Sequence, residues 1–184
     1  MKKIKIIAIV LVLLLTFSTV AFAMPGNEGS RAPARGTQSI AEIAIEAEFN
    51  ELVKALQYVD EELDAGLVNL FLEGNRQYTV FAPTDEAFNN LYRLLGIEEI
   101  RDLPPELVLD VLLYHVATGR RAANSVVPPV RERAIRTLLG ENFMVDRNAV
   151  ISDIFGQEVN ILVPNISARN GIIHVIDKVL LPLN

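Results

Sequence analysis

The two histidines of this 184-residue chain, His115 and His174, are the side chains best suited to acid–base or metal chemistry. A catalytic histidine needs a nucleophile, an orienting carboxylate and a pocket, and the sequence places none of these beside either histidine. His115 closes the apolar face of an expected helix, and isoleucine and valine flank His174 in an expected strand. We therefore expect both imidazole rings to be buried, hydrogen-bonded and structural.

The carboxylates form two runs, Asp60–Asp64 and Glu98–Asp102, that could also suggest a site. A calcium loop needs oxygens at alternating positions around a glycine turn, and neither run has that spacing. The chain has no cysteine, and we find no phosphate-binding glycine loop, no Gly-x-Ser-x-Gly elbow and no zinc-binding helix motif. We predict a protein that is not an enzyme and that uses no cofactor and no metal.

The N-terminus predicts export. Lysines at positions 2, 3 and 5 precede an apolar run over residues 6–17, and Ala21-Phe22-Ala23 has the small-x-small pattern of a cleavage site. Because the apolar run is short for a membrane span, we expect a signal peptide over residues 1–23, cleaved between Ala23 and Met24. A retained membrane anchor is the alternative. The product is expected to be secreted, in the extracellular space or the cell envelope, with no membrane span after cleavage.

Composition limits the remaining chain. Residues 24–37 are rich in glycine, proline and arginine and are expected to form a flexible linker, which leaves a single domain over residues 38–184. The net charge of −6 becomes −9 once the three N-terminal lysines are removed, which argues against nucleic acid and anionic membranes as partners. Without cysteines the domain must be stabilised by its core.

The stretch from Tyr78 to Phe88 predicts a strand, the end of that strand and the start of a helix. Tyr78–Phe81 is aromatic and β-branched, which favours a strand, and Pro83 cannot donate to a sheet ladder. Thr84 is a suitable N-cap for a following helix, whose apolar face begins at Phe88. Ser39 and a glutamate three residues later predict a capping box for an earlier helix.

Helical patterns fill the first half of the chain and strand patterns the second. After an expected polar loop over residues 119–130, the predicted strands are Arg133–Leu138, Asn142–Asp146, Ala149–Ile151, Glu158–Val163 and Ile172–Leu180. Tyr78–Phe81 must pair back with this half. The pattern indicates an α+β fold rather than an alternating βαβ sheet.

Three ordered blocks resemble the signature of the fasciclin domain: Thr79–Phe88, Leu113–Val116 and Asn170–Pro182. The residues that match the first and last blocks, which we expect to be structural, are Thr79, Phe81, Pro83, Thr84, Phe88, Asn170, Gly171, His174 and Asp177. The resemblance extends from about Ile40 to Leu183. It implies a fasciclin-like compact wedge of two β-sheets with helices packed along one edge.

The same resemblance implies an adhesion or matrix-interaction module whose partner is an extracellular or cell-surface protein or a polysaccharide. It suggests interaction sites at Tyr114-His115 and at Pro164-Asn165-Ile166, with Ile166 as an exposed apolar contact. Both acidic positions of the family's second site are lost here, so integrin-type recognition is not supported. A small-molecule or polysaccharide binder is the alternative, and a hydrolase is a third. The oligomeric state, and whether Asn165 is glycosylated within Asn165-Ile166-Ser167, remain open.

Overall fold

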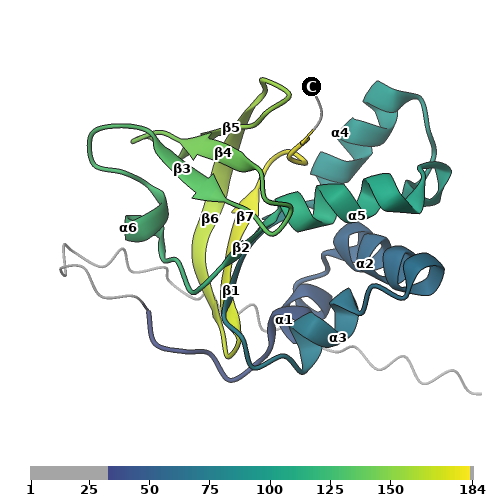
Figure 1. Cartoon of the computed structure of the whole chain (residues 1–184), viewed down its shortest axis with the longest axis horizontal. Coiled ribbons are helices and arrows are strands. Elements are labelled where there is room, and N and C mark those ends of the chain that lie inside the picture. The colour runs from purple at the N-terminus through teal and green to yellow at the C-terminus, as the bar shows by residue number, and fades with distance from the viewer. Residues whose placement is uncertain (1–32, 183–184) are drawn as a thin grey trace, which may run out of the picture.

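Helices and strands separate into two regions of the molecule (Figure 1). The computed structural model describes residues 33–182, so the expected signal peptide and residues 24–32 of the expected linker lie outside the described residues. Helices α1 to α5 pack together on one side of a twisted sheet, and the short α6 lies on the opposite side. Within residues 33–182, no helix combines the length and apolar character that a membrane crossing requires.

The helices begin where the sequence provides caps. Their bounds are α1 (Ile40–Glu46), α2 (Asn50–Leu63), α3 (Leu67–Leu72), α4 (Asp85–Leu95), the 3₁₀ turn η1 (Ile100–Asp102), α5 (Pro105–Tyr114) and α6 (Ala123–Val126). The Ser39 hydroxyl accepts a hydrogen bond from the Glu42 amide in a complete capping box, and the Thr84 hydroxyl caps α4 in the same way. A positive φ at Glu48 lies in the break between α1 and α2.

Seven strands form one continuous series of pairs, in the order β2-β1-β7-β6-β5-β4-β3. Their bounds are β1 (Tyr78–Pro83), β2 (Val116–Thr118), β3 (Arg133–Arg136), β4 (Asn142–Val145), β5 (Val150–Ser152), β6 (Glu158–Ala168) and β7 (Gly171–Ile176). β1 runs parallel to β7, and the other pairs are antiparallel. The expected α+β wedge is confirmed. Its two sheets are joined because the long strand β6 pairs with β7 along one part and with β5 along another.

The core has two parts, separated by the central strands. Val80 of β1 and Ile173 of β7 belong to the larger cluster, under the helices. Phe81 of β1 and Ile176 of β7 point the other way, into a second cluster among the strands. Because both faces are covered, β1 and β7 are buried along their whole length.

Two elements differ from the sequence prediction. The expected loop over residues 119–130 contains the single-turn helix α6, whose four residues carry too little periodicity to detect. The strand expected to end at Val163 continues to Ala168. Pro164, which suggested an end, is accommodated because the strand is irregular there.

Arg120 holds the start of the described chain against the sheet. Its guanidinium donates to the carbonyl oxygens of Pro33 and Ala34, each at 3.1 Å, and to that of Ala168 at 2.9 Å. It also donates to the Gly171 carbonyl and the Ser167 hydroxyl. The end of the expected linker therefore lies against the turn between β6 and β7.

Candidate functional site

A short apolar ridge stands out on strand β6. Leu162 and Val163 are 52% and 39% exposed, and Pro164 beside them is also exposed. Scattered apolar residues are normal on a protein surface, but three in succession on a strand are not, since a strand normally turns alternate side chains inward. We call Leu162, Val163 and Pro164 the β6 ridge.

Two bulges produce the ridge. Between the pairs Ile161↔Ile176 and Ile166↔Ile173, β6 advances by five residues while β7 advances by three. Each bulge inserts one extra residue, which breaks the alternation and turns neighbouring side chains outward. Asn165, next to the ridge, has a positive φ of 67°. Bulges of this kind commonly re-aim side chains at binding sites.

His174 hydrogen-bonds both to the bulged part of β6 and to the loop after β2. Its Nδ1 accepts from the Asn165 amide at 3.3 Å, and its Nε2 donates to the Arg121 carbonyl at 2.9 Å. The ring is fully buried and stacks on Phe81 with 5.3 Å between centroids. Burial lowers the pKa of His174, against the raising effect of the hydrogen bond to Arg121, so the ring is neutral at neutral pH. The ring therefore positions the bulge that carries the ridge.

His115 is used in a similar way inside the fold. Its Nδ1 donates to the Val111 carbonyl at 2.7 Å, and its Nε2 accepts from the Leu180 amide at 2.9 Å. Burial lowers the pKa of His115 to about 4, and this outweighs the raising effects of the Val111 hydrogen bond and of Asp153. Since backbone groups occupy both ring nitrogens of each histidine, neither ring is available to take a proton from a substrate, which argues against the hydrolase alternative.

The five expected interaction residues are placed very differently. Tyr114 and His115 are 0% and 2% exposed, so that pair closes α5 against the strands and offers no surface. Ile166, expected to be an exposed contact, is only partly exposed and packs against the larger core. The Asn165 side chain accepts from the Ala123 amide and so caps α6. Only Pro164 is fully on the surface.

Leu162 and Val163 end the predicted strand Glu158–Val163, in which one of two neighbours is expected to face the core. The available signal was Pro164, since a proline within a strand pattern often marks a bulge. The ridge is therefore adjacent to the expected site but consists mainly of other residues.

Asn170 and Gly171 of the last block join the helices to the sheet. The Asn170 carboxamide accepts from the Ile40 amide and donates to the Phe71 carbonyl. A Cβ on Gly171 would lie 2.2 Å from the Tyr78 carbonyl oxygen, so a larger residue would push β7 from β1. Asp177 accepts from the Asn160 amide and side chain beyond the end of β7.

Thr79 of the first block ties β1 to the loop after β2. Its hydroxyl donates to the Gly119 carbonyl at 2.7 Å and accepts from the Arg121 amide at 2.8 Å. Arg121 also receives the His174 hydrogen bond, so Thr79 and His174 fix the same loop. Among residues 33–182, no group of three histidine, aspartate or glutamate side chains is arranged to hold a metal ion.

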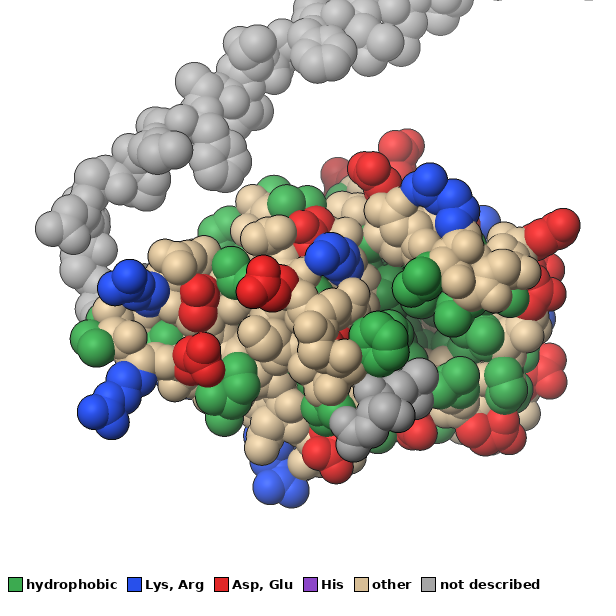
Figure 2. Space-filling model, turned by 90° about the horizontal axis from the view of Figure 1, so that it is seen from above, with side chains coloured by type: hydrophobic (Ala, Val, Ile, Leu, Met, Phe, Trp, Pro, Cys, Tyr) green, Lys and Arg blue, Asp and Glu red, His purple; other side chains and the backbone are tan. Residues whose placement is uncertain are grey.

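A hollow between α4 and α5 bears on the small-molecule alternative. It has a volume of about 160 Å³ and is lined by aliphatic and phenylalanine side chains alone. Figure 2 shows hydrophobic side chains gathered around a hollow on the upper face of the molecule. A polysaccharide does not suit such a lining, because its hydroxyl groups would lose their hydrogen bonds with water and find no partner.

We expect His174→Ala to lower the free energy of unfolding by about 1–3 kcal/mol, because the Asn165 amide and the Arg121 carbonyl would lose their buried partner. Urea denaturation at neutral pH measures the change. The exposed Thr118, at the end of β2, provides the control substitution Thr118→Ala. A loss no larger for His174→Ala than for this control would contradict the supporting role of the ring.

A family model described as the fasciclin domain matches residues 47–182. The chain belongs to the fasciclin domain family.

This fasciclin domain has relatives of very different length. It is 34% identical over 149 residues to the uncharacterized protein sll1735 of Synechocystis sp., a match that covers 78% of this chain and 97% of that protein. It is 32% identical over 120 residues to transforming growth factor-beta-induced protein ig-h3 of Sus scrofa. That match covers 62% of this chain but only 16% of ig-h3, so the chain spans a small part of that relative.

A solved structure supports the fold. A domain pair from the insect cell adhesion molecule fasciclin I matches with a TM-score of 0.52 and 17% sequence identity. The match covers 72% of this chain and 46% of that one. At this identity the likeness supports the architecture and says nothing of ligands.

Proposed function

We propose that this fasciclin domain is a secreted or cell-surface adhesion module that binds an extracellular or cell-surface protein through the β6 ridge. The observation that carries the proposal is the run of three exposed apolar residues on a strand that buried contacts hold in place. Exposed apolar groups with a fixed geometry are favourable contact points, since little conformational freedom is lost on binding.

The surroundings of the ridge favour contact through side chains. Pro164 has no amide hydrogen, and the bulges break the regular spacing of backbone groups. A partner strand would therefore pair poorly along this part of β6, whereas apolar pockets on a partner could receive Leu162 and Val163. The chain's net charge of −6 disfavours nucleic acid and anionic lipid surfaces.

The proposal includes export. We propose that residues 1–23 act as a signal peptide cleaved between Ala23 and Met24. Residues 24–37 then form a linker ahead of the single domain, which spans residues 38–184. The contacts of Arg120 with Pro33 and Ala34 support a start of the ordered module slightly before Gln38.

Leu162→Asp should abolish partner binding while changing the free energy of unfolding by no more than about 0.5 kcal/mol, because the side chain is largely exposed. The immobilised protein is incubated with surface extracts of the producing cells, and the retained proteins are quantified by mass spectrometry. Val130 is 77% exposed and lies outside the ridge, so Val130→Asp introduces the same charge as a control.

Two outcomes would contradict the proposal. Equal retention by the wild-type chain and Leu162→Asp would mean that the binding surface lies elsewhere. Equal loss in Leu162→Asp and Val130→Asp would mean that added charge, and not the ridge, governs retention.

A further inference from the structure

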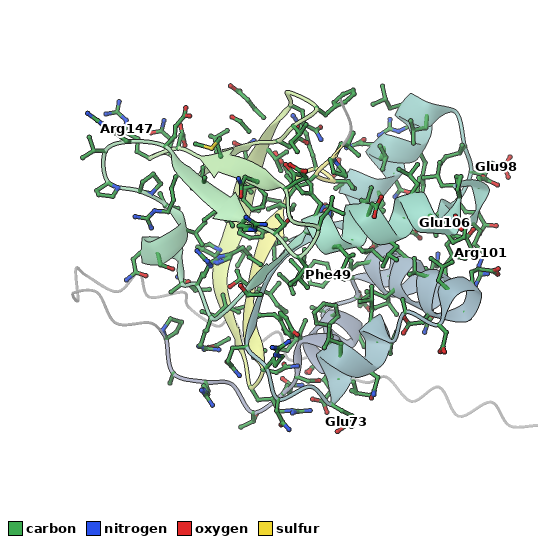
Figure 3. All side chains as sticks on the ribbon, viewed as in Figure 1. Phe49, Glu73, Glu98, Arg101, Glu106 and Arg147 are labelled. Carbon is green, nitrogen blue, oxygen red and sulfur yellow. The ribbon has the colours of Figure 1, made fainter. Side chains whose placement is uncertain are left out.

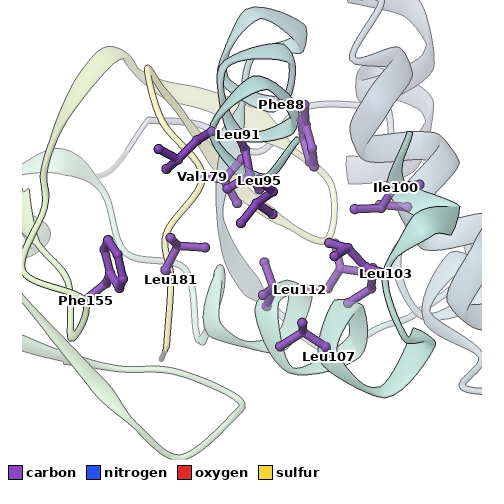
Figure 4. A pocket seen from close by; sticks show the side chains of 14 residues that line it. Phe88, Leu91, Leu95, Ile100, Leu103, Leu107, Leu112, Phe155, Val179 and Leu181 are labelled. Atoms are coloured by element: carbon purple, nitrogen blue, oxygen red, sulfur yellow. The ribbon is translucent and has the colours of Figure 1, made fainter. Parts of the chain in front are cut away.

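The hollow between α4 and α5 is a concave surface lined only by apolar side chains. Phe88 and Leu91 line it from α4, Leu107 and Val111 from α5, and Val179 and Leu181 from the segment after β7 (Figure 4). We call it the α4–α5 groove. Every lining side chain is apolar, so a bound group could make no side-chain hydrogen bond within it.

The mouth of the groove exposes more apolar surface than a folded domain needs to. Leu94 is 72% exposed, Leu95 is 49% exposed and Phe155 is 55% exposed, and all three line the groove. Leu94 and Leu95 come from the end of α4, and Phe155 comes from the turn between β5 and β6. An apolar group that entered the groove could therefore continue along its rim without returning to water.

A second, partly polar hollow adjoins the first. It has a volume of about 220 Å³ and shares Leu91, Leu94, Val179 and Leu181 with the α4–α5 groove. Unlike the groove, it is also lined by polar side chains, those of Asn90, Gln157 and Lys178. We call these three residues the polar shelf.

Charge is distributed unequally along the groove. On the polar shelf, the exposed Lys178 donates one hydrogen bond to the Glu158 carbonyl, and Arg93 donates a hydrogen bond to Asn90. At the other end, Glu98 and Glu106 lie near the outer ends of α4 and α5, and Arg101 nearby is already paired with Glu61 (Figure 3). A negatively charged head group would be attracted to the shelf and repelled from the far end, which fixes one orientation for a ligand.

We propose that the α4–α5 groove binds the hydrocarbon chain of a single-chain carboxylate amphiphile, with its carboxylate on the polar shelf beside Lys178 and Asn90. A dry apolar cavity of about 150 Å³ is large enough to accept a benzene-sized group, so the groove holds roughly six carbons of a chain. Further methylenes lie against Leu94 on the way to the shelf. This site is separate from the β6 ridge and does not depend on the proposed adhesion.

The chain is tested with a neutral apolar dye, N-phenyl-1-naphthylamine, whose fluorescence rises in apolar surroundings. We expect saturable binding of one dye per chain, displaced by dodecanoate and by dodecanol. Leu107→Trp fills the groove without adding charge and should weaken dye binding by at least about tenfold, since most of the buried contact is lost. Leu162→Asp, on the β6 ridge, should leave dye binding unchanged.

The position of the carboxylate head group is tested by substituting, one at a time, the two lysines within residues 33–182. Lys178→Gln should weaken displacement by dodecanoate by about three- to tenfold and leave dodecanol unaffected, as expected for one partly solvated charge pair. Lys54→Gln removes the same charge from α2, where Lys54 pairs with Glu51 and does not line either hollow, and should change neither. Melting temperatures of all variants show whether the fold is retained.

The proposal is overturned if the dye does not saturate, or if a folded Leu107→Trp variant binds it as tightly as the wild-type chain. It is also overturned if Lys178→Gln and Lys54→Gln have equal effects on dodecanoate. Dye binding that is lost as the chain dimerises at higher concentration would assign the groove to a second copy of the chain instead.

Discussion

Acidification from pH 7 to pH 4 should lower the free energy of unfolding by about 3 kcal/mol through His115 alone. The buried ring has a pKa of about 4, against 6.5 for an ordinary histidine. Between these two values the unfolded chain binds a proton that the folded chain does not. The contribution is therefore complete above pH 6.5 and is lost as the pH falls towards 4, and His174 acts in the same direction.

Urea denaturation at half-unit steps from pH 7 to pH 4 measures this loss. The control variant His115→Gln lacks the titrating group. The difference in free energy of unfolding between the wild-type chain and this variant should therefore shrink as the pH falls. The pKa of Asp146 is lowered, chiefly by the hydrogen bond from the Val150 amide. Carboxylates of this kind lose their contribution to stability at lower pH than His115 does. A stability difference between the wild-type chain and His115→Gln that stays constant from pH 7 to pH 4 would contradict a buried neutral His115.

Tyr114→Ala should lower the free energy of unfolding by about 3–5 kcal/mol, the usual result of emptying a large aromatic site in a core. The side chain is 0% exposed and meets the Phe143 ring edge-on with 5.9 Å between centroids. Its hydroxyl donates to the Asn142 carbonyl at 3.1 Å and accepts from the Ile154 amide at 3.3 Å. The residue thus joins α5 to β4 and to the loop before β6.

The milder variant Tyr114→Phe separates packing from hydrogen bonding. It keeps the ring and removes the hydroxyl, so we expect a loss of about 1–3 kcal/mol from the two buried backbone groups left unpaired. Thermal and urea denaturation of both variants give the comparison. A neutral Tyr114→Phe would contradict the role of the two hydrogen bonds, and a Tyr114→Ala cost no greater than that of Tyr114→Phe would contradict the packing role.

Local chemistry made much of the fold predictable. Pro83 and Thr84 indicated where β1 ends and α4 begins, and the structure confirms both. Ser39 likewise specified the start of α1. These boundaries could be predicted because each depends on hydrogen bonds within a few residues.

The surfaces proposed for binding depend on contacts that the sequence does not show. The β6 ridge exists because β6 has two more residues than β7 over the same length, which cannot be seen before the partner strand is known. Leu91 and Leu107 belong to the apolar faces of α4 and α5, and nothing in their spacing distinguishes a groove from a closed core. The groove arises because α4 and α5 leave space between those faces.

The contacts of Arg120 have a mechanical consequence for the chain. Tension on the chain ahead of Pro33 passes through the guanidinium to Ala168 and Ser167, at the end of β6. The ridge at Leu162 lies on the same strand. A pull between the chain ahead of Pro33 and a partner held at the ridge would therefore be carried in part along a single strand of the sheet.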